Sequence, residues 1–186
     1  MLNVSEIPVY KIRGTALLRL SNPYAAVIYG QVAEASINPP EAISSALNRL
    51  AWISKFGPPH VIISTDYSVE KVELERPWFL MTAWRLEIDG SVTSVEGARS
   101  VLEHRMYMKN PLSKVSLVVP KPHRTISVFA TVKNATGLVS EVLSHLGLLY
   151  ARVVLGDYGG RHFVIDVDPV PRLENKEEAL AVAELL

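Results

Sequence analysis

The sequence predicts an α+β protein with mixed sheets, helices packed on one face, and two small α/β units. Three observations favour this class. Segments with alternating apolar residues, typical of strands, stand between longer segments whose apolar residues recur at helical spacing. Of the 186 residues, 48% are hydrophobic and 20% are charged, which is the composition of a globular chain. This length suffices for one domain or two small ones.

The clearest pattern runs from residue 125 to residue 168 and predicts a β-α-β-β unit. Thr125–Val132 alternates as a strand does, and Leu138–Leu146 carries apolar residues at helical spacing. Gly147 follows the last periodic residue, where a left-handed conformation ends a helix without steric cost. Two further strands are expected, Ala151–Leu155 and Arg161–Asp168.

Residues 1–76 are expected to form a first unit in the order β-β-α-β-β. Its helix has a capping-box signal, because Asn38 precedes Pro39 and Glu41 stands three residues after Asn38. Its predicted elements are the strands Val9–Leu20 and Tyr24–Ser36, a helix from Asn38 to Gly57, and the paired strands His60–Thr65 and Glu70–Leu74.

Residues 77–186 are expected to form the second unit, β-α-β followed by β-α-β-β-α. It begins with Pro77–Ile88, an apolar segment that predicts a core strand or, because exposed apolar edges aggregate, a subunit interface. A helix over Val95–Lys109 and a strand over Lys114–Val119 follow. Asn175 and Glu178 have capping-box spacing before a last helix.

Composition narrows the function classes. The chain has no cysteine and a net charge of zero, which excludes disulfides and thiolate metal sites and gives no long-range attraction to nucleic acid. No metal site and no cofactor are predicted. With no membrane-spanning apolar run and no signal-peptide pattern, we expect a cytoplasmic protein without a membrane partner.

Basic residues nevertheless cluster between Arg99 and Ser140, where Glu103 is the sole acidic residue. Two interpretations stay open: a solvated surface, or a face for a phosphate backbone. The candidate RNA-binding residues are Arg105, Lys109, Lys121, Arg124 and Lys133.

Few residues stand in a pattern that indicates catalysis. Asp166 and Asp168 share one strand face, as a metal or acid–base pair requires, but solvated aspartates are ordinary at a strand end. Gly156–Gly160 contains glycines without the spacing of a phosphate-binding loop and is interpreted as a turn. Lys55 stands at the end of an apolar helix, where its positive charge interacts favourably with the helix dipole, so it is interpreted as a structural residue.

Several segments resemble the archaeal tRNA-splicing endonuclease family. The order of Val142–Gly147, Leu149–Leu155 and Phe163–Asp166 is similar to that family's helix ending in glycine, strand, turn and strand. Asp89–Leu102 resembles its N-terminal capped helix, and Pro23–Leu74 resembles the remaining half of its nuclease-like domain.

The resemblance implies a structural, non-catalytic subunit. Asp166 occupies the place of the catalytic tyrosine, no histidine stands at Asn22-Pro23-Tyr24, and only Lys55 falls near the catalytic lysine, so no catalytic residue is predicted here. Such a subunit would work in tRNA processing, with a catalytic endonuclease subunit and precursor tRNA as partners. The candidate partner-binding residues are Asp66, Trp78, Phe79 and Trp84.

Two alternatives remain. Residues 124–186 have the β-α-β-β-α order of an ACT-like small-molecule-sensing domain, in which Asn134–Gly137 would be the ligand-contacting loop. The other alternative is a stand-alone enzyme of unknown class, although no nucleophile–base pair or metal set is visible in the sequence.

Overall fold

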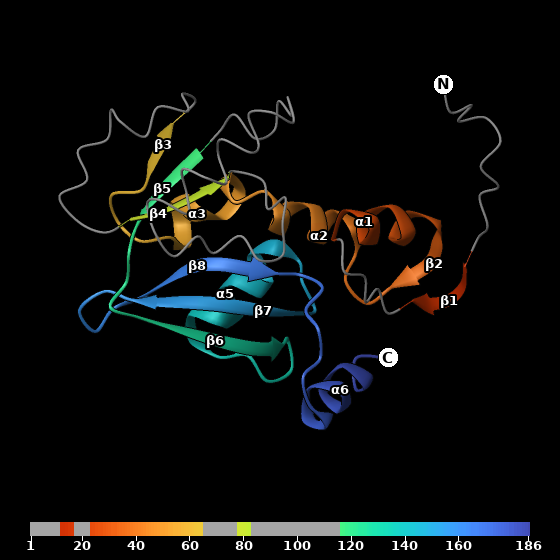
Figure 1. The fold of residues 1–186 in the computed structure, drawn as a ribbon. Coiled ribbons are helices and arrows are strands. Elements are labelled where there is room, and N and C mark those ends of the chain that lie inside the picture. The colour runs from red at the N-terminus through yellow and green to blue at the C-terminus, as the bar shows by residue number, and fades with distance from the viewer. Residues whose placement is uncertain (1–11, 17–22, 65–77, 83–115) are drawn as a thin grey trace, which may run out of the picture.

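A computed structural model describes residues 12–16, 23–64, 78–82 and 116–186 (Figure 1). It is an α+β fold, as the sequence predicts, with a three-stranded antiparallel sheet, a second three-stranded sheet, a parallel strand pair and several helices. In these ranges no helix is both long and apolar enough to cross a membrane.

The β-α-β-β prediction is confirmed at the C-terminal end of the chain. Strands β6 (Arg124–Thr131), β7 (Tyr150–Asp157) and β8 (His162–Asp168) form one antiparallel sheet in that order. Helix α5 (Gly137–Leu146) lies between β6 and β7 in sequence and ends at Gly147, whose φ of 69° is the left-handed conformation expected there.

The two faces of this sheet differ in what covers them. Val142 and Leu143 of α5 are buried in the same core cluster as Ala151 and Val153 of β7, so α5 packs on the face that carries these two β7 residues (Figure 1).

On the opposite face, Phe129, Arg152 and Asp168 stand in one cross-strand row, because residues opposite each other in an antiparallel pair share a face. The next row contains Val154 and Asp166. This second, half-buried face is called the open face below.

Helix α6 (Lys176–Ala183) packs against one end of the sheet through Val182 and Tyr150. Its predicted cap is confirmed, because the Asn175 side chain accepts a hydrogen bond from the Glu178 backbone N–H at 2.8 Å.

The N-terminal part corrects one prediction. Pro23–Val32 is helix α1, not the first part of a strand, and only β2 (Ala33–Ser36) is extended. Proline suits the first helical position, and Ala26 is buried against Ile43 and Leu47 of the next helix, so tertiary packing overrides the strand-like residues of this segment. Strand β2 pairs in parallel with β1 (Ile12–Ala16).

The predicted helix from Asn38 to Gly57 is two helices, α2 (Pro40–Leu47) and α3 (Leu50–Phe56). Asn48 adopts an extended conformation between them and its side chain accepts from the Leu50 N–H at 3.2 Å. Asn38 makes no capping hydrogen bond at α2, so the capping-box prediction is wrong. Both helices contact β8 and α5 (Figure 1).

The second sheet has the order β3-β5-β4 and is antiparallel. It consists of β3 (Ile62–Ser64), β4 (Trp78–Thr82) and β5 (Ser116–Pro120), so the strand predicted over Lys114–Val119 is confirmed. Strand β3 pairs with β5, whereas its predicted partner Glu70–Leu74 lies outside the described residues. The predicted helix Val95–Lys109 also lies outside them.

One core cluster joins the helices to both three-stranded sheets. It contains Trp52 and Phe56 of α3, Leu143 of α5, and Leu117 and Val119 of β5. The predicted division between residues 76 and 77 falls within an undescribed range and stays a prediction.

Candidate functional site

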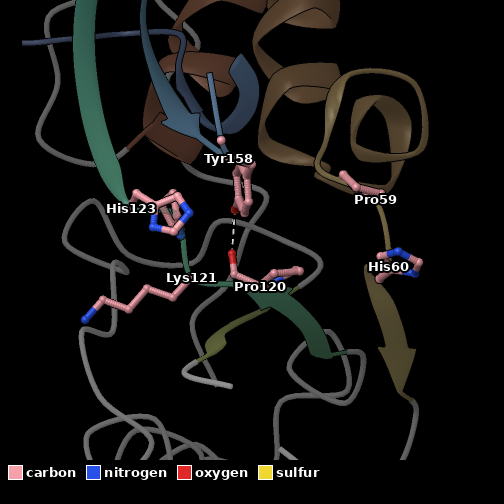
Figure 2. Close-up of a pocket in the computed structure, with 8 residues that line it drawn as sticks. Pro59, His60, Pro120, Lys121, His123 and Tyr158 are labelled. Atoms are coloured by element: carbon pink, nitrogen blue, oxygen red, sulfur yellow. Dashed lines mark hydrogen bonds between the residues drawn. The ribbon is translucent and has the colours of Figure 1, made fainter. Parts of the chain in front are cut away.

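Three chain connections meet at a pocket between the two three-stranded sheets (Figure 2). Pro59 and His60 come from the connection between α3 and β3, residues 120–123 from the end of β5 and its connection to β6, and Tyr158 and Gly159 from the turn between β7 and β8. Its volume is about 640 Å³, within the range of ligand-binding pockets. The prolines at positions 59, 120 and 122 restrict the backbone, which keeps two of the three connections in place.

Tyr158 ties the β7–β8 turn to the end of β5. Its hydroxyl donates a hydrogen bond to the carbonyl oxygen of Pro120 (Figure 2). Its ring makes an edge-on contact with Phe163 at 5.7 Å between centroids. Burial raises the pKa of the Tyr158 hydroxyl above its ordinary value, so the group stays protonated and keeps its role as a donor.

The chemistry of the pocket suits an anionic ligand with an apolar part. Lys121, His60 and His123 supply nitrogen donors, whereas none of the eight described lining residues is acidic. Figure 2 shows His123 beside the Tyr158 ring, Pro59 and His60 on the other side, and Lys121 extending outward. Proline and tyrosine side chains supply apolar surface, and a lysine ammonium attracts phosphate.

His60 has a backbone conformation that is uncommon for a residue other than glycine. Its φ is 66°, and among the described residues it is the one non-glycine residue with a positive φ. A non-glycine residue in this region costs about 1–2 kcal/mol. Residues held in this way cluster at binding and catalytic sites, which makes the position of His60 in the pocket notable.

A buried ion pair lies on the open face of the C-terminal sheet. Nε and Nη2 of Arg49 both donate to Oδ1 of Asp166, at 3.2 Å and 3.0 Å. The Arg49 side chain is only 2% exposed and that of Asp166 is 18% exposed. Arg49 stands at the start of α3, in the break after α2, which directs its side chain to β8. Val154 lies opposite Asp166 on β7, and Asp157, at the end of the same strand, adjoins the pocket residue Tyr158. At about 3.3 Å per residue, Val154 and Asp157 are roughly 10 Å apart along β7.

The neighbouring row of the open face also contains ion pairs. Nη2 of Arg152 donates to both carboxylate oxygens of Glu178 at 3.0 Å, and Nη1 lies 3.3 Å from Glu174. Asp168, opposite Arg152, accepts a hydrogen bond from the Val170 N–H at 3.1 Å. In the described part of the chain, no three histidine or acidic side chains are grouped so that they could hold a metal ion.

The structure places the predicted site residues in different regions. Of the predicted RNA-binding residues, Lys121 lines the pocket, Arg124 begins β6, and Lys133 follows it, with its Nζ donating to the Glu184 carbonyl oxygen. Of the predicted partner-binding residues, Trp78 and Phe79 belong to β4. The predicted site residues that lie outside the described ranges are Asp66, Trp84, Arg105 and Lys109. No binding role is tested by these positions, and each stays a prediction.

Sequence reasoning singled out Lys121 and Asp166 but missed the other residues that form the pocket, and it missed Arg49 of the ion pair. Tyr158 and Gly159 belong to Gly156–Gly160, the segment interpreted as a turn. A usable signal is the alternation of proline with Lys121 and His123, which predicts a stiff segment carrying two polar side chains. For Arg49, the signal is a charged residue within an otherwise apolar helical stretch.

Comparison with known proteins relates the fold to ATP-grasp ligases. Neither a protein-family model nor a curated protein sequence matches the chain. Among solved structures, a RimK domain ATP-grasp protein from Sphaerobacter thermophilus DSM 20745 matches with a TM-score of 0.64 and 15% identity, over 92% of this chain and 78% of that one. The ATP-grasp ligase PsnB, complexed with a phosphomimetic variant of its minimal precursor, Mg and ADP, matches with a TM-score of 0.55 and 10% identity, over 87% of this chain.

The chain spans 64% of that PsnB chain, slightly less than two thirds of its length. PsnB complexed with the precursor peptide PsnA2 and AMPPNP gives a TM-score of 0.53 at 9% identity. At identities this low, the likeness shows that the chain shares its fold with these ligases.

The predicted membership of the tRNA-splicing endonuclease family is therefore wrong. The neighbours are ATP-grasp ligases, which overturns the predicted roles in tRNA processing and as a structural endonuclease subunit, together with the catalytic-subunit and precursor-tRNA partners. The ACT-like and unknown-enzyme alternatives gain no support either. The physical reason is that a helix ending in glycine followed by two strands is a local unit that many folds contain. The resemblance rested on such units and on no rare motif.

Proposed function

We propose that the chain binds ATP in the pocket between the two three-stranded sheets and serves an ATP-dependent ligase-type reaction. The likeness in fold to ATP-grasp ligases over most of the chain carries the proposal. The pocket adds support, because it offers a lysine and two histidines to a triphosphate and apolar surface to a base.

Nucleotide binding is tested by titrating ATP while the thermal unfolding midpoint is measured. A ligand that binds only the native state raises the stability, by about 2.7 kcal/mol at a hundred times its Kd. We expect a saturable rise with ATP and a weaker one for the double variant Lys121→Ala/His123→Ala. Lys176→Ala, an exposed lysine at the start of α6, is the matched control and is expected to behave as the wild type.

Two results would contradict this proposal in different ways. If ATP at millimolar concentration leaves the midpoint of the wild type unchanged, nucleotide binding is refuted. If the double variant responds to ATP as strongly as Lys176→Ala does, the nucleotide binds elsewhere than at residues 120–123.

The ligase-type reaction requires a second measurement. PsnB is complexed with a precursor peptide and, in another structure, with ADP, so peptides are the first substrates to test and ADP the product to measure. We expect ADP formation that depends on the added substrate. Nucleotide binding without any ADP release across peptide and amino-acid substrates would limit the function to nucleotide binding.

A further inference from the structure

Strand β6 is an outer strand of the C-terminal sheet, because within the described part of the chain it pairs with β7 alone (Figure 1). This pairing keeps one register over all eight residues of β6, without a bulge. The strand contains no proline, and its one charged residue, Arg124, stands at its first position. It therefore lacks the short length, proline, bulge and central charge with which proteins usually block an exposed edge.

The hydrogen bonds around β6 indicate which main-chain groups point away from β7. The Val132 N–H donates to the Leu149 carbonyl oxygen at 2.8 Å, and hydrogen-bonded pairs recur at every second residue of an antiparallel ladder. The residues out of phase with Val132 therefore direct their N–H and C=O groups to the other side of β6. In the middle of the strand these residues are Thr125, Ser127 and Phe129. This side of β6 is called the free edge below.

The free edge ends at Thr131, which is also out of phase with Val132. Its N–H donates to the Asn134 side chain at 2.7 Å, and its carbonyl oxygen accepts from the N–H groups of Asn134 and Ala135. A turn of the chain thus satisfies these outward groups. For Ser127 and Phe129, in contrast, no described strand supplies a main-chain partner on this side. Unpaired edges of this kind accept an added strand, which gains main-chain hydrogen bonds along its length.

The charge around β6 indicates which kind of strand fits. Residues 121–140 include Lys121, Arg124 and Lys133 and no acidic residue. None of these three forms an ion pair with a carboxylate of the described residues. Asp157, opposite Arg124 in the register, accepts a hydrogen bond from the turn between β7 and β8. The free edge therefore lies between basic side chains that attract carboxylates.

We propose that the free edge of β6 binds an extended peptide with acidic residues, which adds to the C-terminal sheet as a further strand. Main-chain hydrogen bonds hold the peptide, and the half-buried side chains of Ile126 and Val128 give it apolar contact on one face. A second copy of the chain fits less well, because antiparallel pairing of β6 with itself would place the Arg124 end of each strand near the Lys133 end of the other. This binding goes beyond the proposed nucleotide binding and does not depend on it.

Amide hydrogen exchange of the full-length protein, followed by NMR without nucleotide, tests the geometry of the free edge. Before any peptide is added, we expect the N–H groups of Ser127 and Phe129 to exchange faster than that of Val128, which points to β7. The probe is a short synthetic peptide of alternating valine and threonine with glutamates at both ends. At saturation it is expected to slow exchange at Ser127 and Phe129. Protection of these two N–H groups without peptide would overturn the proposal, since another part of the chain or a second copy would then cover the edge.

Peptide affinity, measured by fluorescence anisotropy, tests whether main-chain hydrogen bonds hold the peptide. Methylation of the peptide nitrogens that face β6 is expected to weaken binding to the wild type about tenfold or more. Ser127→Pro removes an outward N–H, which an edge strand tolerates, and is expected to have a similar effect. Ser127→Ala keeps this N–H and is the matched control, with the affinity of the wild type.

Two results would overturn strand addition: no saturable binding of the glutamate peptide, or equal affinity for its methylated form. The second comparison uses the wild type, so it decides the question even if Ser127→Pro does not fold. A peptide with lysines in place of the glutamates is expected to bind more weakly, and Arg124→Glu to reduce this difference. Equal affinity of the wild type for both peptides would overturn the preference for an acidic partner.

Discussion

The side-chain amide of Asn38 both donates a hydrogen bond to the main chain of Tyr150 and accepts one from it. Its Nδ2 donates to the Tyr150 carbonyl oxygen at 2.8 Å, and its Oδ1 accepts from the Tyr150 N–H at 3.3 Å. The same amide also accepts from the Leu149 N–H and donates to the Pro169 carbonyl oxygen. One buried side chain therefore satisfies the main chain at the start of β7 and just after β8.

Asn38→Ala is expected to lower the free energy of unfolding by about 3 kcal/mol, because buried main-chain groups would lose their partners. Asn134→Ala is the control. Its side chain is exposed and accepts one hydrogen bond, from the Thr131 N–H, so we expect a loss of about 1 kcal/mol. Urea unfolding followed by tryptophan fluorescence measures both losses, and equal losses would contradict the role given to Asn38.

The Arg49–Asp166 pair predicts a specific pattern in a double-mutant cycle. Arg49→Met alone is expected to cost about 3 kcal/mol, because the 18%-exposed Asp166 carboxylate would lose both hydrogen bonds from the guanidinium. The double variant Arg49→Met/Asp166→Leu is expected to be more stable than Arg49→Met, since it also lacks the half-buried carboxylate that the guanidinium stabilises. Additive losses in chemical unfolding would indicate that the two side chains are not coupled.

Tyr158 predicts a loss of stability at high pH. Its pKa is raised in the folded state by burial, whereas in the unfolded chain it titrates at about 10. A raised folded-state pKa means that the contribution of Tyr158 is fully present below about pH 10 and is lost as the pH rises further. Tyr158→Phe lacks both the hydroxyl and this dependence.

We therefore expect the wild type to exceed Tyr158→Phe by about 1 kcal/mol at about pH 8, the contribution of one hydrogen bond. This advantage is expected to shrink at about pH 11. Urea midpoints of both proteins at the two pH values provide the measurement. An advantage that stays constant would show that Tyr158 does not titrate differently in the folded and unfolded states.

His60→Gly separates the ring of His60 from its backbone conformation. Glycine adopts a φ of 66° without steric cost, so we expect no loss of stability. Loss of the ring from the pocket is expected to weaken ATP binding about fivefold, which corresponds to about 1 kcal/mol. Calorimetric titration measures the Kd, with His162→Ala on β8 as a control outside the pocket. An unchanged Kd would remove His60 from the nucleotide site.

The sequence was sufficient for the C-terminal sheet because each local signal there agrees with the others. Gly147 ends α5 in the conformation that its position requires, and the strands on either side alternate in the expected way. Asn175 caps α6 through the predicted hydrogen bond. Agreement between local propensity and tertiary packing makes such a segment predictable.

Long-range contacts decided the elements that were predicted wrongly. Asn38 has the sequence context of a helix cap, yet its partners are Tyr150 and Pro169, more than a hundred residues away. The strand-like residues of α1 form a helix because Ala26 packs against α2. No local pattern contains this information.

The candidate site was not predictable for the same reason. His60, Lys121 and Tyr158 come from three connections that are far apart in the sequence, and only the packing of the two sheets brings them together. Asp166 and Asp168 were recognised as sharing a strand face, as the register confirms. The partner of Asp166, however, is 117 residues away at Arg49, and no sequence spacing indicates it.

The ties from Asn38 to Tyr150 and Pro169 also constrain when the chain can fold. They span 112 and 131 residues, so during synthesis Asn38 leaves the ribosome long before its acceptors exist. Helices α2 and α3 contact α5 and β8, so they must wait for these later elements before they can fully bury their apolar faces. Contacts of such high sequence separation slow folding, because closing the intervening loop costs conformational entropy before the contacts contribute any stabilisation. A nascent chain that stops before α5 would therefore expose Trp52 and Phe56 to chaperones and to aggregation.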